Sequence, residues 1–308
     1  MKLGESLGKV RPKSAFKNTK GLHHDDWFRT ELELTMPIHL QDLPWDGRYE
    51  AMSDLLHVAR TLTLPSFLSG KAVATTKPDG TLVTEVDRQA EVAMRNWLSE
   101  HFAQDAVVGE EGPVMPGVSK WTWVLDPIDG TASFGHQVPL WGTLVALRYD
   151  ENSVAGACDL PALDLGAKGT VHKAHLLIQG HEQKILARPS QCRLQDATLT
   201  TTGWDYFRMA GAEEAYVDLA NQAGRTKGWG DCYGLWLLLA GHVDVVVEPL
   251  LHPWDIEWLW PLAQASGIKL TDWHGRDCVC PRQCIVSHGG ALHDEVVNIL
   301  QRHAQENM

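Results

Sequence analysis

The sequence predicts a mixed α/β protein, and three observations lead to this prediction. Segments with apolar residues at helical spacing alternate with short β-like runs, and no linker or repeat interrupts them. The composition, 44% hydrophobic and 21% charged, is typical of a globular protein rather than a disordered one. The length of 308 residues allows one large domain or two small ones, each with a sizeable core.

Charge and hydropathy exclude two classes of partner. The chain has 27 basic and 39 acidic residues, a formal net charge of −12, whereas a general nucleic-acid binder needs a basic surface. The longest apolar stretch, Leu235–Val247, is interrupted by His242 and Asp244, so no membrane span is expected. We therefore expect a cytoplasmic protein that binds neither nucleic acid nor membrane.

The first 45 residues are predicted to be a basic, disordered extension. Residues 1–20 carry six Lys and Arg side chains against Glu5 alone, and they show no hydrophobic pattern. A basic, acid-poor start is also typical of an organelle transit peptide. An over-long gene model, with Met36 as the true start, is a further alternative.

The ordered part is predicted to begin near Asp46 and to form one unit, 46–308, of two tightly packed α/β halves. The halves are expected to span about 46–190 and 191–308. Apolar spacing predicts helices at Tyr49–Leu64, Thr84–Phe102, Ala212–Ala223, Gly234–Ala240, Ile256–Ser266 and Ala291–His303. Short apolar runs predict strands at Ala106–Val108, Trp121–Leu125, Leu140–Tyr149, Leu194–Leu199 and Val243–Val247.

The most informative segment is Asp126-Pro-Ile-Asp129-Gly-Thr131, which follows an apolar strand. Pro127 is expected to end that strand, Gly130 permits a tight approach, and Thr131 can cap a following helix. Two carboxylates then lie beside free N–H groups at a helix N-terminus. Carboxylates bind divalent cations and such N–H groups bind phosphate, so the segment indicates a metal-assisted phosphoryl site. On spacing alone, a helix cap on a surface turn explains it equally well.

Two further acidic segments also have simple structural explanations. Glu110 and Glu111 follow a short strand, where adjacent carboxylates repel unless a cation offsets their charge or the loop is exposed. Asp255, in His252-Pro253-Trp254-Asp255, would by itself be a helix cap.

The cysteines do not indicate a secreted disulfide framework. Three of them are scattered, and the other three cluster near His274 and His288 as Cys278, Cys280 and Cys284. Structural zinc sites usually pair their ligands in C-x-x-C knuckles, which this spacing lacks. Core and loop positions are therefore the preferred interpretation, with a zinc site as the alternative.

Taken together, the acidic segments resemble the inositol monophosphatase superfamily. Gly109-Glu110-Glu111, Asp126-Pro-Ile-Asp129-Gly-Thr131 and Pro253-Trp254-Asp255 resemble its three signatures, in the right order. Lys77-Pro-Asp79-Gly-Thr-Leu-Val-Thr84-Glu-Val-Asp87 resembles the segment before the first signature, and the resemblance covers about residues 48–300. It implies a layered αβαβα sandwich of the inositol monophosphatase and fructose-1,6-bisphosphatase type. It also implies a homodimeric, Mg²⁺-dependent and often lithium-inhibited phosphomonoesterase.

The resemblance also implies roles for individual residues, with two or three Mg²⁺ ions. Glu110, Asp126 and the carbonyl of Ile128 would hold one ion, Asp126, Asp129 and Asp255 a second, and a third would lie near Glu110 and Asp87. Gly130 and Thr131 would present the helix N-terminus to the phosphate. The expected catalytic residues are Glu110, Thr131 and Asp129, of which Glu110 and Thr131 would orient the attacking water.

A haloacid-dehalogenase-type phosphatase is excluded by spacing. That class uses Asp-x-Asp-Gly-Thr with the first Asp as nucleophile, whereas Asp126 and Asp129 are one residue further apart. It also needs a downstream Gly-Asp-x-x-x-Asp, and here Gly230-Asp231 has Leu235 at the place of the second Asp.

The segments around Trp141, Asp231 and Trp273 resemble the histidinol-phosphatase branch more than the inositol branch. In that branch Asp231 would face the substrate, and Glu248 matches the position that contacts its non-phosphate end. Histidinol phosphate carries an ammonium and an imidazole, which two carboxylates would attract. As simpler explanations, Asp231 would be a helix cap and Glu248 a charge at a strand end.

One departure from the family pattern lies beside the expected phosphate site. Related enzymes tend to carry Lys-Asn-Phe after Gly-Thr, and this chain has Ala132-Ser133-Phe134, followed closely by His136. His136 is therefore expected near the mouth of the site.

The partner is predicted to be a small phosphate monoester, most simply L-histidinol phosphate. The alternatives are an inositol-1-monophosphatase or broad sugar-phosphate phosphatase, and an inactive phosphate-ester-binding subunit.

Overall fold

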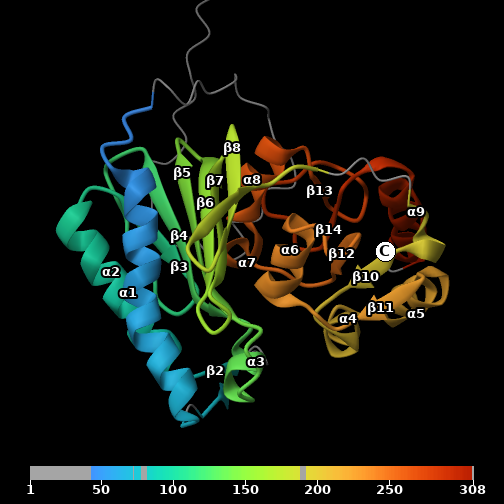
Figure 1. The fold of residues 1–308 in the computed structure, drawn as a ribbon, viewed down its shortest axis with the longest axis horizontal. Coiled ribbons are helices and arrows are strands. Elements are labelled where there is room, and N and C mark those ends of the chain that lie inside the picture. The colour runs from blue at the N-terminus through green and yellow to red at the C-terminus, as the bar shows by residue number, and fades with distance from the viewer. Residues whose placement is uncertain (1–42, 72, 78–81, 188–191, 307–308) are drawn as a thin grey trace, which may run out of the picture.

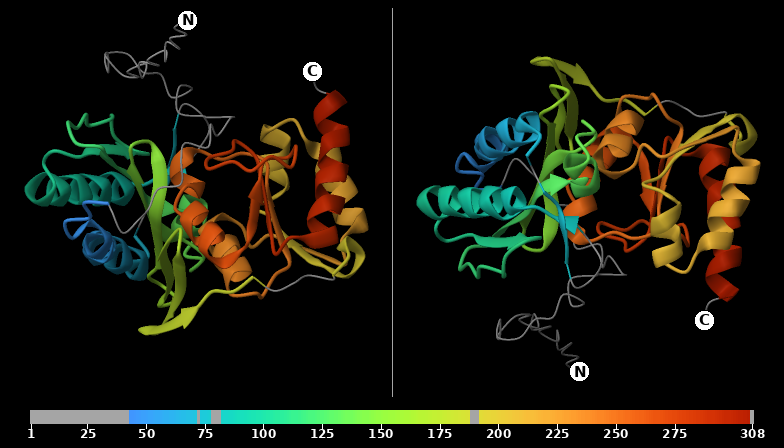
Figure 2. Two further views of the ribbon diagram at one scale, coloured as in Figure 1. Left: turned by 90° about the horizontal axis from the view of Figure 1, so that it is seen from above. Right: turned by 90° about the horizontal axis from the view of Figure 1, so that it is seen from below.

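Helices and sheets alternate in layers across the molecule. The computed structural model describes residues 43–71, 73–77, 82–187 and 192–306. Figures 1 and 2 show a helix layer, a sheet, a central helix layer, a second sheet and an outer helix layer in that order. This arrangement confirms the predicted αβαβα sandwich.

The first helix layer consists of α1 (Arg48–Ser69) and α2 (Glu85–His101). α2 begins where Thr84 caps it, because its hydroxyl accepts from the Asp87 N–H while the Asp87 carboxylate accepts from the Thr84 N–H. α1 runs beyond the predicted end at Leu64, through Pro65, for one more turn. That turn brings Phe67 onto the rings of Phe134 and Trp141, and this packing outweighs the bond that proline removes.

In the part of the chain that the structure describes, seven strands form the first sheet, in the order β3-β4-β5-β6-β7-β8-β9. β3 and β4 are parallel, and the later neighbours are antiparallel. The strands are β3 (Ala106–Gly109), β4 (Trp121–Asp129), β5 (Gly142–Tyr149), β6 (Asn152–Leu160), β7 (Leu165–Thr170), β8 (Lys173–Ile178) and β9 (His181–Lys184). The sequence predicts the first three and misses the rest.

The prediction that Pro127 ends β4 is wrong. The strand continues to Asp129, and its pairing with β5 shifts register, since Asp126 pairs with Leu144 and Asp129 with Gly142. One extra residue is therefore inserted in β4, as in a β-bulge, which is a position where proline is tolerated.

The bulge matters for chemistry. In a regular strand, residues three apart point to opposite faces of the sheet. The inserted residue reverses this alternation, so that Asp126 and Asp129 direct their carboxylates toward the same site.

The central layer holds α6 (Asp231–Leu239), α7 (Pro253–Ile256) and α8 (Leu259–Ser266), visible in Figure 1 between the two sheets. The single helix predicted at Ile256–Ser266 is thus a separate α8 preceded by a short α7. The predicted Gly234–Ala240 helix begins three residues earlier, at Asp231. A cluster of buried side chains from this layer and both sheets forms the main core.

The described residues form a second sheet of five strands, in the order β11-β10-β12-β14-β13. Its strands are β10 (Thr198–Thr200), β11 (Arg225–Lys227), β12 (Val245–Glu248), β13 (Lys269–Thr271) and β14 (Cys284–Ser287). The predicted Leu194–Leu199 strand is instead a 3-10 turn, η3 (Leu194–Asp196), followed by β10. The outer helices are α4 (Trp204–Met209), α5 (Glu213–Gln222) and α9 (Gly290–Glu306).

A buried ion pair joins the first sheet to the central helix layer. Arg148 of β5 donates through Nε to Glu257, at the C-terminal end of α7, over 2.5 Å, and its second terminal nitrogen contacts the other carboxylate oxygen. The pair links the first sheet to the helix that carries Asp255.

The prediction of a disordered extension mainly concerns residues 1–42, which lie outside the described residues. Leu43 and Trp45, which that prediction includes, instead pack against the buried side chains between the first helix layer and the first sheet. The Trp45 ring lies 5.3 Å from that of Trp121. Of the helices described, none has both the length and the apolarity needed to cross a membrane.

Candidate active site

A cavity of about 230 Å³ opens between the two sheets. It lies where β3, β4 and β12 end and where α3 (Thr131–Gly135), α6 and α7 begin. Its lining includes nine of the residues singled out from the sequence: Glu110, Asp126, Ile128, Asp129, Gly130, Thr131, Asp231, Glu248 and Asp255. Asp87 contacts the lining residue Thr131 but is not itself part of the lining.

Three carboxylates gather at one end of this cavity. Asp126, Asp129 and Asp255 each offer an oxygen, and these oxygens all lie within 4.8 Å of one another. Burial first, and then the neighbouring carboxylates, raise the pKa of Asp126 and Asp255 well above its usual value. Burial and Asp231 raise the pKa of Asp129 to about 8. Such mutual repulsion is relieved by a bound cation.

Each of these carboxylates is anchored through one oxygen by a backbone N–H. Asp126 Oδ1 accepts from Ile128 N over 3.0 Å, and Asp255 Oδ2 accepts from His252 N over 2.7 Å. Asp129 Oδ2 accepts from Cys232 N at the start of α6. The anchoring fixes the direction of each carboxylate and leaves its second oxygen for a ligand.

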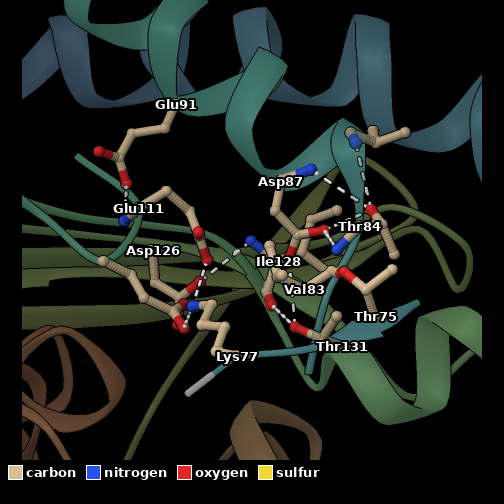
Figure 3. Close-up of polar contacts among 12 residues, drawn as sticks. Thr75, Lys77, Val83, Thr84, Asp87, Glu91, Glu111, Asp126, Ile128 and Thr131 are labelled. Atoms are coloured by element: carbon tan, nitrogen blue, oxygen red, sulfur yellow. Dashed lines mark hydrogen bonds and ion pairs between the residues drawn. The ribbon is translucent and has the colours of Figure 1, made fainter. Parts of the chain in front are cut away.

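Glu110 and Glu111 lie just after β3 and share an ammonium group. Lys77 Nζ lies 2.7 Å from Glu110 Oε1 and 2.6 Å from Glu111 Oε1, and Figure 3 shows Lys77 beside Glu111. Burial raises the pKa of Glu110 to about 7, against the opposing effect of Lys77. Burial alone would lower the pKa of Lys77, but Glu110 outweighs it and the pKa is raised.

Asp87 connects the start of α2 to the start of α3. Its Oδ2 caps α2 through Thr84, and its Oδ1 lies 3.2 Å from the Thr131 hydroxyl (Figure 3). That hydroxyl also lies 3.0 Å from the Ile128 carbonyl oxygen, so it can donate to either acceptor. Burial raises the pKa of Asp87. Thr131 is thereby held at the cavity wall with its oxygen free to accept a hydrogen bond.

The capping role predicted for Thr131 is wrong, because Gly130 occupies the N-cap of α3 and Thr131 is its first residue. Gly130 has φ +84°, and a Cβ there would lie 2.9 Å from the Leu140 carbonyl oxygen. Only glycine fits this turn without strain. The turn places the backbone of 130–131 directly in the cavity wall.

Two further acidic residues, Asp231 and Glu248, line the same cavity. Glu248, 2% exposed, accepts from Thr202 N over 3.2 Å through Oε2, whereas no donor among the described residues reaches its Oε1. Burial and Asp231 raise the pKa of Glu248 to about 8, and burial raises that of Asp231 to about 6. An uncompensated buried carboxylate oxygen is a position where a cationic or hydrogen-bonding ligand is favoured.

Several lining residues were not predicted from the sequence. Thr202 anchors Glu248 and contacts Asp231, and Asp205 and Tyr206 of α4 complete that wall. The sequence carries no local signal for them, because they reach the cavity only through the pairing of β10 with β12.

His252 and Trp254 also line the cavity, with rings stacked at 4.9 Å and an interplanar angle of 8°. Both stand in the motif around Asp255, which could have revealed them.

Two sequence hypotheses do not match the site. His136 ends α3, where its Nδ1 contacts the Ala132 carbonyl oxygen at 2.8 Å, and it is exposed rather than part of the cavity lining. Cys278, Cys280 and Cys284 are buried core residues, and among the described residues they belong to no group of three metal-capable ligand atoms. The preferred core interpretation of these cysteines is confirmed.

The donor set of the cavity fits a hard divalent cation. Carboxylate and carbonyl oxygens are the ligands that Mg²⁺ prefers, and the lining includes Glu110, Asp126, Ile128, Asp129 and Asp255. Burial first, and then the neighbouring carboxylates, raise the pKa of the three aspartates, and a bound cation would offset both effects.

Comparison with known proteins agrees with the resemblance. A sequence model of the inositol monophosphatase family matches residues 55–305. The histidinol-phosphatase of Chlorobaculum parvum is 32% identical over 243 residues, covering 78% of this chain and 91% of the relative. That of Streptomyces coelicolor is 30% identical and covers 87% of this chain and 99% of the relative.

Among solved structures, an inositol monophosphatase from Zymomonas mobilis superposes with a TM-score of 0.70 at 28% identity, covering 84% of this chain and 99% of that one. The similarities confirm the resemblance drawn from the acidic motifs, including its histidinol-phosphatase branch.

Proposed function

The chain is a phosphoric monoester hydrolase of the inositol monophosphatase family, and we propose that it hydrolyses L-histidinol phosphate to L-histidinol with the help of Mg²⁺. The names of the relatives support this substrate, since two of them are histidinol-phosphatases of similar length. The single observation that favours it within this chain is the buried Glu248 oxygen, which has no donor among the described residues and belongs to a side chain that lines the cavity together with the aspartate cluster.

The charged groups that line the cavity suit the charged groups of this substrate. The aspartate cluster around Asp126 suits the metal and phosphate, and the additional carboxylates of Asp231 and Glu248 in the same lining suit a cationic group. Histidinol phosphate has a phosphate at one end and an ammonium and an imidazole further along. Inositol phosphate offers only neutral hydroxyls there, which are less strongly attracted to carboxylates.

In this proposal the metal ligands are those predicted from the sequence. Asp126, Asp129 and Asp255 hold one ion, Glu110, Asp126 and the Ile128 carbonyl hold another, and Asp87 lies near a third position. Bound Mg²⁺ would neutralise the phosphate charge and lower the pKa of an attacking water. Two or three ions are expected, which titration calorimetry would count.

The side chains orient the reacting groups. Glu110 and Thr131 hold the attacking water by accepting its hydrogen bonds, and Asp87 keeps the Thr131 hydroxyl in place. The N–H groups of Gly130 and Thr131 at the start of α3 face the phosphate oxygens. Asp129, fixed by Cys232 N, lies beside them on the side of α6.

A substrate panel tests the proposal. Phosphate release is measured from histidinol phosphate, inositol 1-phosphate and fructose 1,6-bisphosphate, with Mg²⁺ and with EDTA. Fastest turnover is expected on histidinol phosphate, with loss of activity in EDTA and in Asp126→Asn. Asp150→Asn, at an exposed turn where it pairs with Lys120, is the matched control and should stay active.

Fastest turnover on inositol 1-phosphate would replace the substrate with the inositol alternative. Activity that persists in EDTA would overturn the metal role, and binding without turnover in saturating Mg²⁺ would favour an inactive binding subunit.

Assembly and location complete the proposal. We expect a cytoplasmic homodimer in which each chain folds as two packed halves, about 46–190 and 191–308, behind a disordered extension. Light scattering on the purified chain gives the oligomeric state, and limited proteolysis is expected to remove the extension and spare the two halves.

A further inference from the structure

Helix α2 carries a second polar group behind the candidate active site. Asp87, Glu91 and Arg95 follow one another at four-residue spacing, so they share one face of the helix. All three are buried, with exposures of 0%, 1% and 8%. Asp87 contacts the cavity wall through Thr131, whereas Glu91 and Arg95 have no part in the proposed reaction.

Glu91 and Arg95 instead form hydrogen bonds with the backbone of the loop that follows β3. Glu91 Oε1 accepts from Arg95 Nε over 2.7 Å, and its Oε2 accepts from the backbone N–H of Glu111, also over 2.7 Å (Figure 3 shows the latter contact). The two terminal nitrogens of Arg95 donate to the carbonyl oxygens of Gly112 and Pro113 over 3.2 and 3.0 Å. Three consecutive residues of the loop are thus fixed by their backbones.

The close approach of the Glu91 side chain also explains why glycines stand on either side of Glu110 and Glu111. A Cβ at Gly109 would lie 2.6 Å from the Glu91 carboxyl carbon, and one at Gly112 would lie 2.9 Å from Glu91 Oε1. Because Arg95 and Glu111 hold the Glu91 side chain at both oxygens, it cannot move aside. The sequence Gly109-Glu110-Glu111-Gly112 is therefore shaped by a residue of α2.

We propose that Glu91 and Arg95 are positioning residues for the Glu110 metal ligand. Glu110 stands between Gly109 and Glu111, both of which lie against Glu91, so its backbone is ordered before any ion binds. A ligand on an ordered loop loses less conformational entropy on binding, and partners of this kind set metal affinity. The inference rests on the proposed role of Glu110 in holding Mg²⁺.

The test compares two substitutions on the same helix in the full chain. Glu91→Gln cannot accept from both Arg95 and Glu111 N–H, since one of its ends is an amide nitrogen. Glu85→Gln is the matched control, because Glu85 is exposed and, among the described residues, its carboxylate contacts Gln89 and Arg88 at 3.2 and 3.7 Å on the surface of the same helix. Calorimetry measures the Mg²⁺ Kd, and hydrogen exchange measures protection of the 109–113 amides.

Glu91→Gln is expected to weaken Mg²⁺ binding by about tenfold and to speed exchange of the 109–113 amides. Its substrate KM at saturating Mg²⁺ should stay unchanged. General destabilisation of the chain would not change the Mg²⁺ Kd while leaving the substrate KM unaltered. Glu85→Gln should match the unaltered chain in all three measurements. If Glu91→Gln does not fold, Arg95→Lys, which keeps the charge but loses the two carbonyl contacts, is measured instead and should weaken Mg²⁺ binding less.

Unchanged Mg²⁺ affinity and exchange in Glu91→Gln would overturn the positioning role while leaving the proposed function intact. An unaltered chain that binds no Mg²⁺ would overturn the proposed function, and the positioning role with it.

Discussion

Replacing Glu248 with Gln removes a negative charge from the cavity with little change of shape. Gln can still accept from Thr202 N through its one oxygen, so the wall keeps its 3.2 Å contact. The lost feature is the oxygen Oε1, which has no donor among the described residues. If this oxygen receives a cationic group of the substrate, Glu248→Gln should impair substrates with that group and spare those without it.

The size of the effect follows from hydrogen-bond energies and from the pKa of Glu248. A hydrogen bond to a charged group contributes about 1.5–3 kcal/mol, or roughly 10- to 150-fold in kcat/KM. Because burial raises the pKa of Glu248 to about 8, releasing its proton at pH 7 costs about 1.4 kcal/mol. At pH 8.5 this cost nearly vanishes. The penalty of Glu248→Gln should therefore be several-fold larger at pH 8.5 than at pH 7.

The assay is kcat/KM for histidinol phosphate and for glycerol 2-phosphate, at both pH values, with the variant and the unaltered chain. Glycerol 2-phosphate has no cationic group, so its kcat/KM should barely change. The thermal midpoint should stay equal or rise, since a disfavoured buried charge is removed. An equal loss on both substrates, or a loss independent of pH, would refute the assignment of Glu248 to the cationic end.

Three further predictions concern the metal site and the fold. Burial and Asp231 raise the pKa of Asp129 from 3.8 to about 8, so its contribution to stability is fully present below pH 3.8 and is lost as pH rises from there to about 8. Without metal, the free energy of unfolding should fall between about pH 5 and 8, by up to about 1.4 kcal/mol per pH unit for each such carboxylate, and level off above. The Mg²⁺-induced thermal shift should grow over the same range, and a constant shift would contradict this. Gly130→Ala places a Cβ 2.9 Å from the Leu140 carbonyl oxygen at φ +84°, and should lower the free energy of unfolding, measured in urea, by about 1–3 kcal/mol and reduce activity. Glu257→Gln leaves the buried Arg148 without the Glu257 charge and should lower the free energy of unfolding, measured in urea, by about 3–5 kcal/mol. The double variant Arg148→Met and Glu257→Leu should lower this free energy less, because it leaves no buried charge at either position.

The elements with strong local signals are the ones that the sequence predicts well. α2 begins within one residue of its predicted start at Thr84, and α5 and α9 lie within a few residues of their predicted bounds. A cap and a 3.6-residue apolar spacing depend only on neighbours along the chain. The carboxylates of the cavity were found for the same reason, since they stand at strand ends and helix starts that short motifs reveal.

The second half of the first sheet has no such signal. β6 contains Ala155-Gly156-Ala157 rather than β-branched residues, because the chain at Trp258 approaches it closely. A Cβ at Gly156 would lie only 1.8 Å from the Trp258 carbonyl oxygen. The small residues serve a tertiary contact and therefore weaken the local strand pattern. The bulge in β4 is hidden likewise, since it exists only relative to the register of β5.

The candidate site also shows why a structural and a functional explanation of one carboxylate need not compete. Asp255 is the third residue of α7 and not its N-cap, which is His252, but it accepts from His252 N as the partner residue of a capping box, and an oxygen of the same residue belongs to the aspartate cluster. Asp126 accepts from Ile128 N, and Glu248 accepts from Thr202 N and keeps Oε1 for the cavity. In each case one oxygen is held by the backbone and the other is directed by that bond. A cap or turn is thus the means by which a flexible carboxylate becomes a rigid ligand, so evidence that an acid caps a helix strengthens its candidacy for the site.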